Sequence, residues 1–385
     1  MTTPIAPLPN LLKRLWNHLS RRRKIQFGLL MGLTLVSALA EVVSLGAVLP
    51  FLGILIAPDR VFHRPIVANV AQVLGITSAD QLVLPLTVAF VAAAVVAGAI
   101  RILLLWASTR LAYASGADLG IEVYRRTLYQ PYRVHVTRNS SEVISTITSK
   151  VGTAISVLYQ LMTLISSFAL LAAITLALIT IDPQVALLAI LAFGVSYGLI
   201  SALSHRLLKR NSQRIADEQT HTIKALQEGL GGIRDVLLDG TQPVYCDIYR
   251  QANYTLLRAL GSNNFISGSP RYAIEALGIM LIAALAYGLS HQTGGIVAAL
   301  PVLGALALGA QRLLPALQQS FGAWATIAGN HASLADTLEM LDQPLSAEQL
   351  QPAPSPLSFQ DAIHFNAVRF RYTSEGPWVL DGLNL

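Results

Sequence analysis

Hydrophobic and polar residues alternate along this chain in long blocks. Two stretches with at most one charge, 185–203 and 272–289, are each about as long as a bilayer core requires. Between them, apolar residues recur at helical spacing among charged ones over 205–236 and again over 244–262, with a Gly-Thr-Gln-Pro break at 240–243. The pattern predicts two membrane helices that continue for about 40 Å each beyond the membrane and meet there in a turn.

The segment 108–157 repeats this plan between an earlier pair of apolar stretches. Helical periodicity over 113–129 is interrupted at Pro131 and resumes over 140–157. Residues 65–76 predict a short helix lying flat on the outer surface. We expect an all-α membrane bundle with two long cytoplasmic arms and six spans, at 26–57, 83–107, 158–181, 184–205, 269–290 and 296–317.

Composition supports a membrane protein, and the placement of charge sets its orientation. Hydrophobic residues make up 53% of the chain and charged residues 12%, about half the charged fraction of a globular protein. Lys and Arg number six before the first span, six over 108–157 and eight over 206–268, but only two over 58–82. The positive-inside rule predicts a multi-pass protein of the inner (plasma) membrane with both termini in the cytoplasm. The net charge of +6 is explained by this placement and does not indicate nucleic-acid binding.

The residues at 8–20 place their leucines and Trp16 on one helical face, and the basic cluster 21–24 follows. This pattern predicts an interfacial amphipathic helix. The apolar run behind it is too long for the core of a signal peptide and contains Glu41. A single cysteine excludes an internal disulfide, and the scattered histidines do not indicate a metal site.

The chain changes character after residue 342. A Pro-rich linker at 343–357 separates the membrane domain, 1–342, from a C-terminal part at 358–385. In that part, apolar and polar residues alternate over 363–372 and predict a strand, followed by a turn at 373–377 and a second strand from Trp378.

Six spans, two long arms, a linker and a β-start together resemble the type I exporter fold of ABC transporters. The C-terminal stretch IHFNAVRFRYTSEGPWVLDGLNL resembles the opening of that family's nucleotide-binding domain, in which Tyr372 matches the aromatic residue that stacks on adenine. The resemblance implies a homodimer, with ATP and Mg²⁺ bound by nucleotide-binding domains in a full-length protein. It also implies that the turns at 131–137 and 239–245 are coupling helices that dock on those domains, through Pro131, Tyr132, Gly240 and Thr241.

Three shorter segments resemble a subgroup, the lipid-linked oligosaccharide flippases: SALAEVVSLGAVLPF, SPRYAIEALG and QRLLPAL. Arginines that line the cavity of that subgroup are thought to engage the pyrophosphate of the lipid, and Arg101, Arg271 and Arg312 stand at the matching positions. The resemblance therefore implies a site for an amphipathic lipid-linked substrate, with Glu41 and Glu275 beside the arginines.

Each of these residues also has a structural interpretation. The arginines could extend to the inner headgroups of the bilayer without contacting a substrate. Glu275 follows Arg271 by four residues, so the two can pair on one helix face. Glu41, near the middle of its span, is expected to pair with one of the arginines or to line the cavity.

The family's ATP site requires G-x-x-x-x-G-K-[ST], and no lysine of this chain follows a glycine. We therefore expect no catalytic residue and no nucleotide binding by this chain alone, which would then be a fragment or a split gene product. Three alternatives remain open. They are an ABC exporter of peptides, drugs or plain lipids, a catalytically silent membrane partner of a separate ATPase, and an ion-driven transporter, which would need ionisable residues at the midplane.

Overall fold

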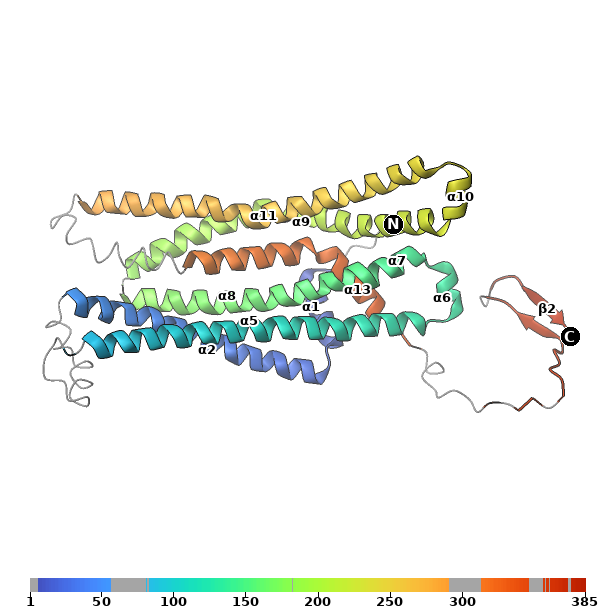
Figure 1. The fold of residues 1–385 in the computed structure, drawn as a ribbon, viewed down its shortest axis with the longest axis horizontal. Helices are drawn as coiled ribbons and strands as arrows, with labels where there is room; N and C mark the ends of the chain where they lie inside the picture. The colour runs from blue at the N-terminus through green and yellow to red at the C-terminus, as the bar shows by residue number, and fades with distance from the viewer. Residues whose placement is uncertain are drawn as a thin grey trace.

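The computed structural model describes residues 6–56, 81, 83–181, 183–290, 313–345, 356, 358–359, 361–372 and 375–385. Long helices run side by side along the long axis of the molecule, and a small β-hairpin lies beyond one end (Figure 1). The expected helical fold class is confirmed. The expected surface helix at 65–76, most of the sixth expected span and Arg312 lie outside the described residues.

Among the described residues, five helices are longer than a bilayer core is thick. The two longest contain 49 residues each, so each extends roughly 70 Å against about 30 Å of hydrocarbon. The predicted continuation of the spans as unbroken helices is therefore confirmed. The five are α2 (Arg21–Ile56), α5 (Val83–Leu128), α8 (Val151–Ile181), α9 (Pro183–Gly231) and α11 (Gln242–Ser290).

Four helical stretches among the described residues are long and apolar enough to cross a membrane: Arg21–Ser44, Val83–Leu128, Ser140–Ala177 and Ile190–Gly231. They overlap the first four expected spans, as a multi-pass membrane protein requires. The fifth expected span, 269–290, is helical within α11 but is not among these four, and several of its side chains lie outside the described part.

The first arm joins α5 to α8 through short elements at the far end of the bundle (Figure 1). These are α6 (Tyr132–Thr137), α7 (Ser140–Ser145) and the π-helix η2 (Thr146–Lys150). Pro131 stands at the N-cap of α6 with an extended backbone, and the side chain of Asn139 caps α7 by accepting a 3.0 Å hydrogen bond from the Ser141 amide. The expected turn at 131–137 is therefore a short helix.

The second arm ends earlier than the sequence pattern indicates. The outgoing helix stops at Gly231, a further helix α10 (Ile233–Leu238) follows Gly232, and α11 begins at Gln242. The predicted continuation of one helix to Val236 is wrong, because two adjacent glycines favour a helix end. The break predicted at 240–243 is present between α10 and α11, where Gly240 has a φ of 66°, but α11 already begins at Gln242.

The long helices pack as two pairs, α2 against α5 and α9 against α11, with α8 in contact with α2, α5 and α9. Residues 313–329 form another helix that connects the pairs. In it, Leu313 packs against Ile174 of α8, and Leu314 and Leu317 pack against Phe193 of α9. This helix therefore contacts both halves of the bundle.

The predicted N-terminal amphipathic helix is present as α1 (Leu8–His18), and its apolar face is buried by protein. Leu11 and Leu15 lie in a core cluster that also contains Leu334 and Leu338 of α13 (His331–Leu341). An ion-pair cluster at the end of α13 adds to this contact, because Asp342 accepts hydrogen bonds from Arg14 Nε at 2.8 Å and His18 Nε2 at 2.6 Å. Burial raises the pKa of Asp342, but hydrogen bonds from His18 and Arg14 outweigh it and hold that pKa below its usual range.

The C-terminal hairpin pairs β1 (Val368–Phe370) antiparallel with β2 (Leu380–Leu383). β1 is shorter than the predicted strand at 363–372, because Ala367 has a φ of 50° and donates its amide hydrogen to Asn384 Oδ1 at 2.7 Å. Pairing resumes beyond this irregularity, where Phe365 and Leu385 exchange backbone hydrogen bonds of 2.7 and 2.9 Å. The predicted hairpin is thus present with an interrupted first strand.

The close approach of α5 to α8 predicts one sensitive position. A Cβ atom at Gly116 would lie 2.0 Å from Ile155 Cγ1, whereas a Cβ at Gly120 would lie 3.5 Å from Val151 Cγ1. We expect Gly116→Ala to destabilise the fold by about 1–3 kcal/mol through overpacking, while Gly120→Ala is neutral or stabilising. Thermal unfolding of both variants in detergent measures the difference.

The double variant Gly116→Ala/Ile155→Ala should recover part of the loss, because it removes the two closest atoms of Ile155. Equal stability of the Gly116→Ala and Gly120→Ala proteins would contradict this description of the α5–α8 contact.

Candidate functional site

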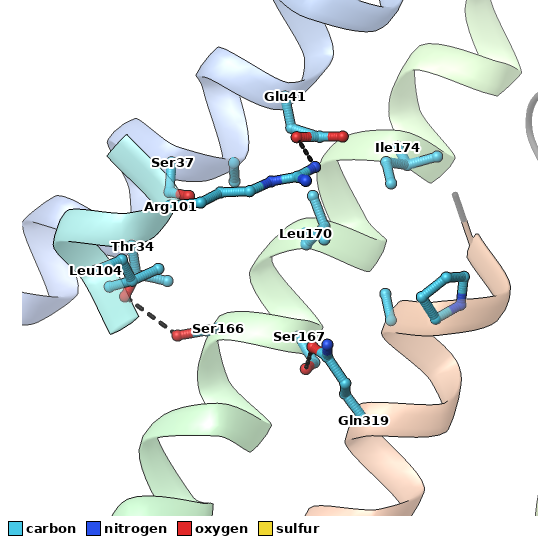
Figure 2. A pocket seen from close by; sticks show the side chains of 13 residues that line it. Thr34, Ser37, Glu41, Arg101, Leu104, Ser166, Ser167, Leu170, Ile174 and Gln319 are labelled. Atoms are coloured by element: carbon cyan, nitrogen blue, oxygen red, sulfur yellow. Dashed lines mark hydrogen bonds and ion pairs between the residues drawn. The ribbon is translucent and has the colours of Figure 1, made fainter. Parts of the chain in front are cut away.

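A polar cavity of about 380 Å³ lies between membrane helices α2, α5, α8 and the helix at 313–329 (Figure 2). Apolar walls at Leu104, Leu170 and Ile174 surround its polar lining. Because such an arrangement is unusual inside a membrane bundle, it is a candidate site by default. The polar lining consists of Thr34, Ser37, Glu41, Arg101, Ser166, Ser167 and Gln319.

An ion pair crosses the top of this cavity in Figure 2. The guanidinium of Arg101, on α5, pairs with the carboxylate of Glu41, on α2. The Glu41 side chain is only 3% exposed, whereas that of Arg101 is 47% exposed. A buried carboxylate needs such a partner, while a guanidinium carries five N–H donors and can serve a second acceptor on its exposed side.

Two weaker polar contacts connect the helices below the ion pair. The Thr34 and Ser166 hydroxyls lie 3.4 Å apart between α2 and α8, and Ser167 donates to Gln319 Oε1 at 3.4 Å. Gln319 reaches the cavity from the helix at 313–329 (Figure 2). Each of the packed helices thus contributes a polar side chain to one space.

Two neighbouring cavities extend this space, and Gln319 lines all three. One, of about 410 Å³, shares Arg101 and Ser166 with the first and reaches Tyr159 on α8. The other, of about 420 Å³, shares Pro315 and is lined by Arg271 of α11. Arg101 and Arg271 therefore line adjoining cavities, although they belong to helices of different pairs.

Arg271 also belongs to a small network on α11. Its Nε donates to Glu275 Oε1 at 2.9 Å, and Gln318 Nε2 donates to the same oxygen at 3.3 Å. The pairing of Arg271 with Glu275 expected from their spacing is therefore formed. The Arg271 side chain remains 60% exposed. Pro270 interrupts the backbone ladder of α11 immediately before this arginine.

The four expected coupling residues lie at the arm ends and line none of these cavities. Pro131 and Tyr132 begin α6 at the end of the first arm, and Gly240 and Thr241 lie between α10 and α11 at the end of the second. Arg312 lies outside the described residues, so its position relative to Arg101 and Arg271 stays a prediction.

Tyr372 lies in the C-terminal hairpin. The centroid of its ring lies 5.0 Å from the ring centroid of Phe370 and 6.4 Å from that of Tyr132, so the hairpin contacts the first arm. The hairpin offers aromatic side chains for stacking on adenine, but no G-x-x-x-x-G-K-[ST] phosphate-binding loop occurs in residues 1–385, so a nucleotide-binding role of Tyr372 stays a prediction.

Gln318 and Gln319, which connect the cavities and the α11 network, were not predicted from the sequence. A signal for them exists, because QQS follows QRLLPAL at the end of an apolar stretch and adjacent amides are uncommon in a span.

The fold and the cavity define a polytopic membrane protein with long helical arms and an internal polar space. The family model for the ABC transporter transmembrane region matches residues 65–296 of the sequence, and the chain belongs to this family. Among solved structures, a bacterial Atm1-family ABC exporter with ATP bound matches with a TM-score of 0.62 at 17% sequence identity. That match covers 95% of this chain and 61% of the exporter chain, so this chain spans less than two thirds of its relative. No curated protein matches the chain.

The Glu41–Arg101 pair predicts an asymmetric response to substitution. Arg101→Met should destabilise the protein by about 1–3 kcal/mol, because it leaves a buried carboxylate without its guanidinium. This loss is smaller than for a fully buried pair, because solvent screens the half-exposed Arg101. The double variant Arg101→Met/Glu41→Gln should recover most of this loss. Thermal unfolding in detergent distinguishes the two.

Arg110→Met provides the matched control, since Arg110 lies on the same helix and stacks over Trp106 at 5.3 Å outside the three cavities. If the double variant is no more stable than Arg101→Met, the ion pair does not account for the effect.

Proposed function

We propose that this chain is the membrane domain of an ATP-driven exporter that moves an amphipathic lipid with a phosphate or pyrophosphate head, such as a lipid-linked glycan. The observation that carries the proposal is that two half-exposed guanidinium groups, Arg101 and Arg271, line adjoining cavities inside a membrane bundle. We include Arg312 in this site from its place in the sequence.

The chemistry of the lining favours an anionic head over a cation. Guanidinium groups bind phosphate oxygens with two parallel hydrogen bonds, and their charge does not vary with pH. Each of the two arginines already pairs with a glutamate, so the resting cavity is close to neutral and the energetic penalty of an empty site is reduced. An incoming phosphate would use the exposed donors, with Gln319 and the hydroxyls of Ser166 and Ser167 as further partners.

The rest of the fold supports an energy-coupled transporter. Helices of roughly 70 Å carry α6 and α10 well beyond the depth of a bilayer, and family membership predicts nucleotide-binding domains at that end. We assign the arm ends to the cytoplasm because Lys and Arg concentrate there. Two copies of the chain would enclose the cavities, and the energy would come from ATP bound by the nucleotide-binding domains.

The transport test uses the complete transporter in liposomes, assembled with its nucleotide-binding domains. A polyprenyl-pyrophosphate glycan should stimulate ATP hydrolysis by the parent, and the triple variant Arg101→Ala/Arg271→Ala/Arg312→Ala should lose this stimulation while basal hydrolysis remains. The reason is that the variant removes the donors for the pyrophosphate but leaves the arms intact. Arg110→Ala/Arg258→Ala controls for lost charge on the same two helices.

A neutral lipid and a peptide in the same assay distinguish the alternative cargoes. An equal response of parent and triple variant to the pyrophosphate lipid would overturn the proposed cargo. Stimulation by the peptide alone would favour a peptide exporter of the same fold.

A second test addresses the arm ends. The Tyr132 side chain is exposed at the start of α6 and contacts Tyr372 of the hairpin. If α6 transmits nucleotide-driven movement, Tyr132→Ala should reduce lipid-stimulated transport at least fivefold with basal ATP hydrolysis retained. Tyr129→Ala, three residues earlier on the same arm, should resemble the parent. Equal transport by the two variants would exclude Tyr132 from coupling.

A further inference from the structure

An apolar groove of about 300 Å³ lies between α1, α2 and α8, and neither Gln319 nor Arg271 belongs to its lining. Its walls come from the three helices and include Leu15, Leu19, Phe27 and Leu158, which are at most 5% exposed, so the groove is formed before any ligand arrives. Trp16 stands edge-on to Phe27, with ring centroids 5.5 Å apart. We call this feature the α1 groove.

We place the α1 groove near a membrane surface from the start of a candidate span. The apolar stretch of α2 that is long enough to cross a membrane begins at Arg21, and the groove residues of α1 and α2 lie within about three turns on either side of it. α1 crosses the bundle at a steep angle to α5 and α8 (Figure 1), as expected for a helix lying along the membrane plane. Ile25 and Leu29 on the neighbouring face of α2 are 58% and 71% exposed and would contact lipid chains.

Lys24 is the charged residue in the lining of the groove. Among the described residues, no carboxylate lies within ion-pair distance of Lys24, Arg21 or Arg22, whereas Arg23 is held by Asp118 at 2.8 Å. Lys24 in the lining, and Arg21 and Arg22 just before it in the sequence, therefore lack an ion-pair partner in the described part of the chain. Charge complementarity points to an anionic group beside Lys24.

We propose that the α1 groove binds one acyl chain of an anionic phospholipid from the adjoining leaflet, with its phosphate at Lys24. The acyl chain moves from one apolar environment to another, so the charged head supplies most of the selectivity. A basic residue at a membrane surface contributes about fivefold in affinity for anionic lipid. The bound chain would fix α1, which in turn holds α13 through the cluster at Asp342.

The proposal does not depend on the cargo of the polar cavity, and it is tested without transport. The chain is purified in a neutral detergent and titrated with phosphatidylglycerol or phosphatidylcholine of the same acyl chains, with bound lipids counted by native mass spectrometry. The parent should bind phosphatidylglycerol at least fivefold more tightly than phosphatidylcholine. Lys24→Gln should remove this preference and leave phosphatidylcholine binding unchanged, while Lys13→Gln, outside the lining, should retain it.

Gly28 offers a way to fill the groove without disturbing its walls. It belongs to the lining, and a Cβ atom there meets nothing within 4 Å, so Gly28→Leu should occupy the space of the acyl chain. Binding of both lipids at this site should then be lost. Gly32→Leu is the matched control, since Gly32 lies one turn further along α2, is equally open and does not line the groove.

Photo-crosslinking on the parent protein keeps the test decisive if Gly28→Leu does not fold. A phosphatidylglycerol with a diazirine on its acyl chain should label the groove segments around Met31 and Leu161 more than the exposed face of α9. Labelling that is uniform along the apolar surface, unchanged binding in Gly28→Leu, or equal affinity of the parent for both lipids would each overturn the proposal.

Discussion

Placing charged side chains among apolar helices is the constraint on which the centre of this structure depends. An ionised group in the bilayer interior is tolerated only where it is paired or faces a polar space. Two pairs in the described part of the chain meet this requirement, Glu41 with Arg101 between α2 and α5 and Arg271 with Glu275 along α11. In both pairs the guanidinium is the more exposed partner. The two carboxylates therefore stabilise the arginines in position and leave part of each guanidinium available to a ligand.

The helix at 313–329 connects these two charged centres. Its apolar residues pack against α8 and α9, and its two amides reach toward opposite sides, Gln318 to Glu275 and Gln319 to Ser167. A change in the distance between the α2–α5 pair and the α9–α11 pair would alter both contacts together. From the first pair α5 continues as an unbroken helix toward α6, and from the second pair α9 and α11 do so toward α10. Movement at the arm ends can therefore reach the cavities through rigid elements.

Periodicity in the sequence was sufficient to predict the elements that depend on local patterns. The long arms, the helix α1, the turn after Pro131 and the C-terminal hairpin all follow from apolar spacing and from Pro or Gly positions. The wrong predictions concern segments in which two local signals compete. At the second arm, Gly231 and Gly232 end the helix before the break predicted at Gly240, and Ala367 interrupts a strand that regular alternation predicts.

Contacts between distant segments could not be predicted in the same way. Apolar spacing indicates which face of α1 is buried, but not that α13 covers it, and a single sequence gives no distance between Arg101 and Gln319. The structure adds that Met162 of α8, almost fully buried, lines both the α1 groove and the cavity that reaches Tyr159. One unbranched side chain is thus shared by the apolar groove and a cavity lined by Arg101. Because methionine fills irregular gaps and changes rotamer readily, movement of α1 at the membrane surface has a direct path to the side of the cavity that contains Arg101.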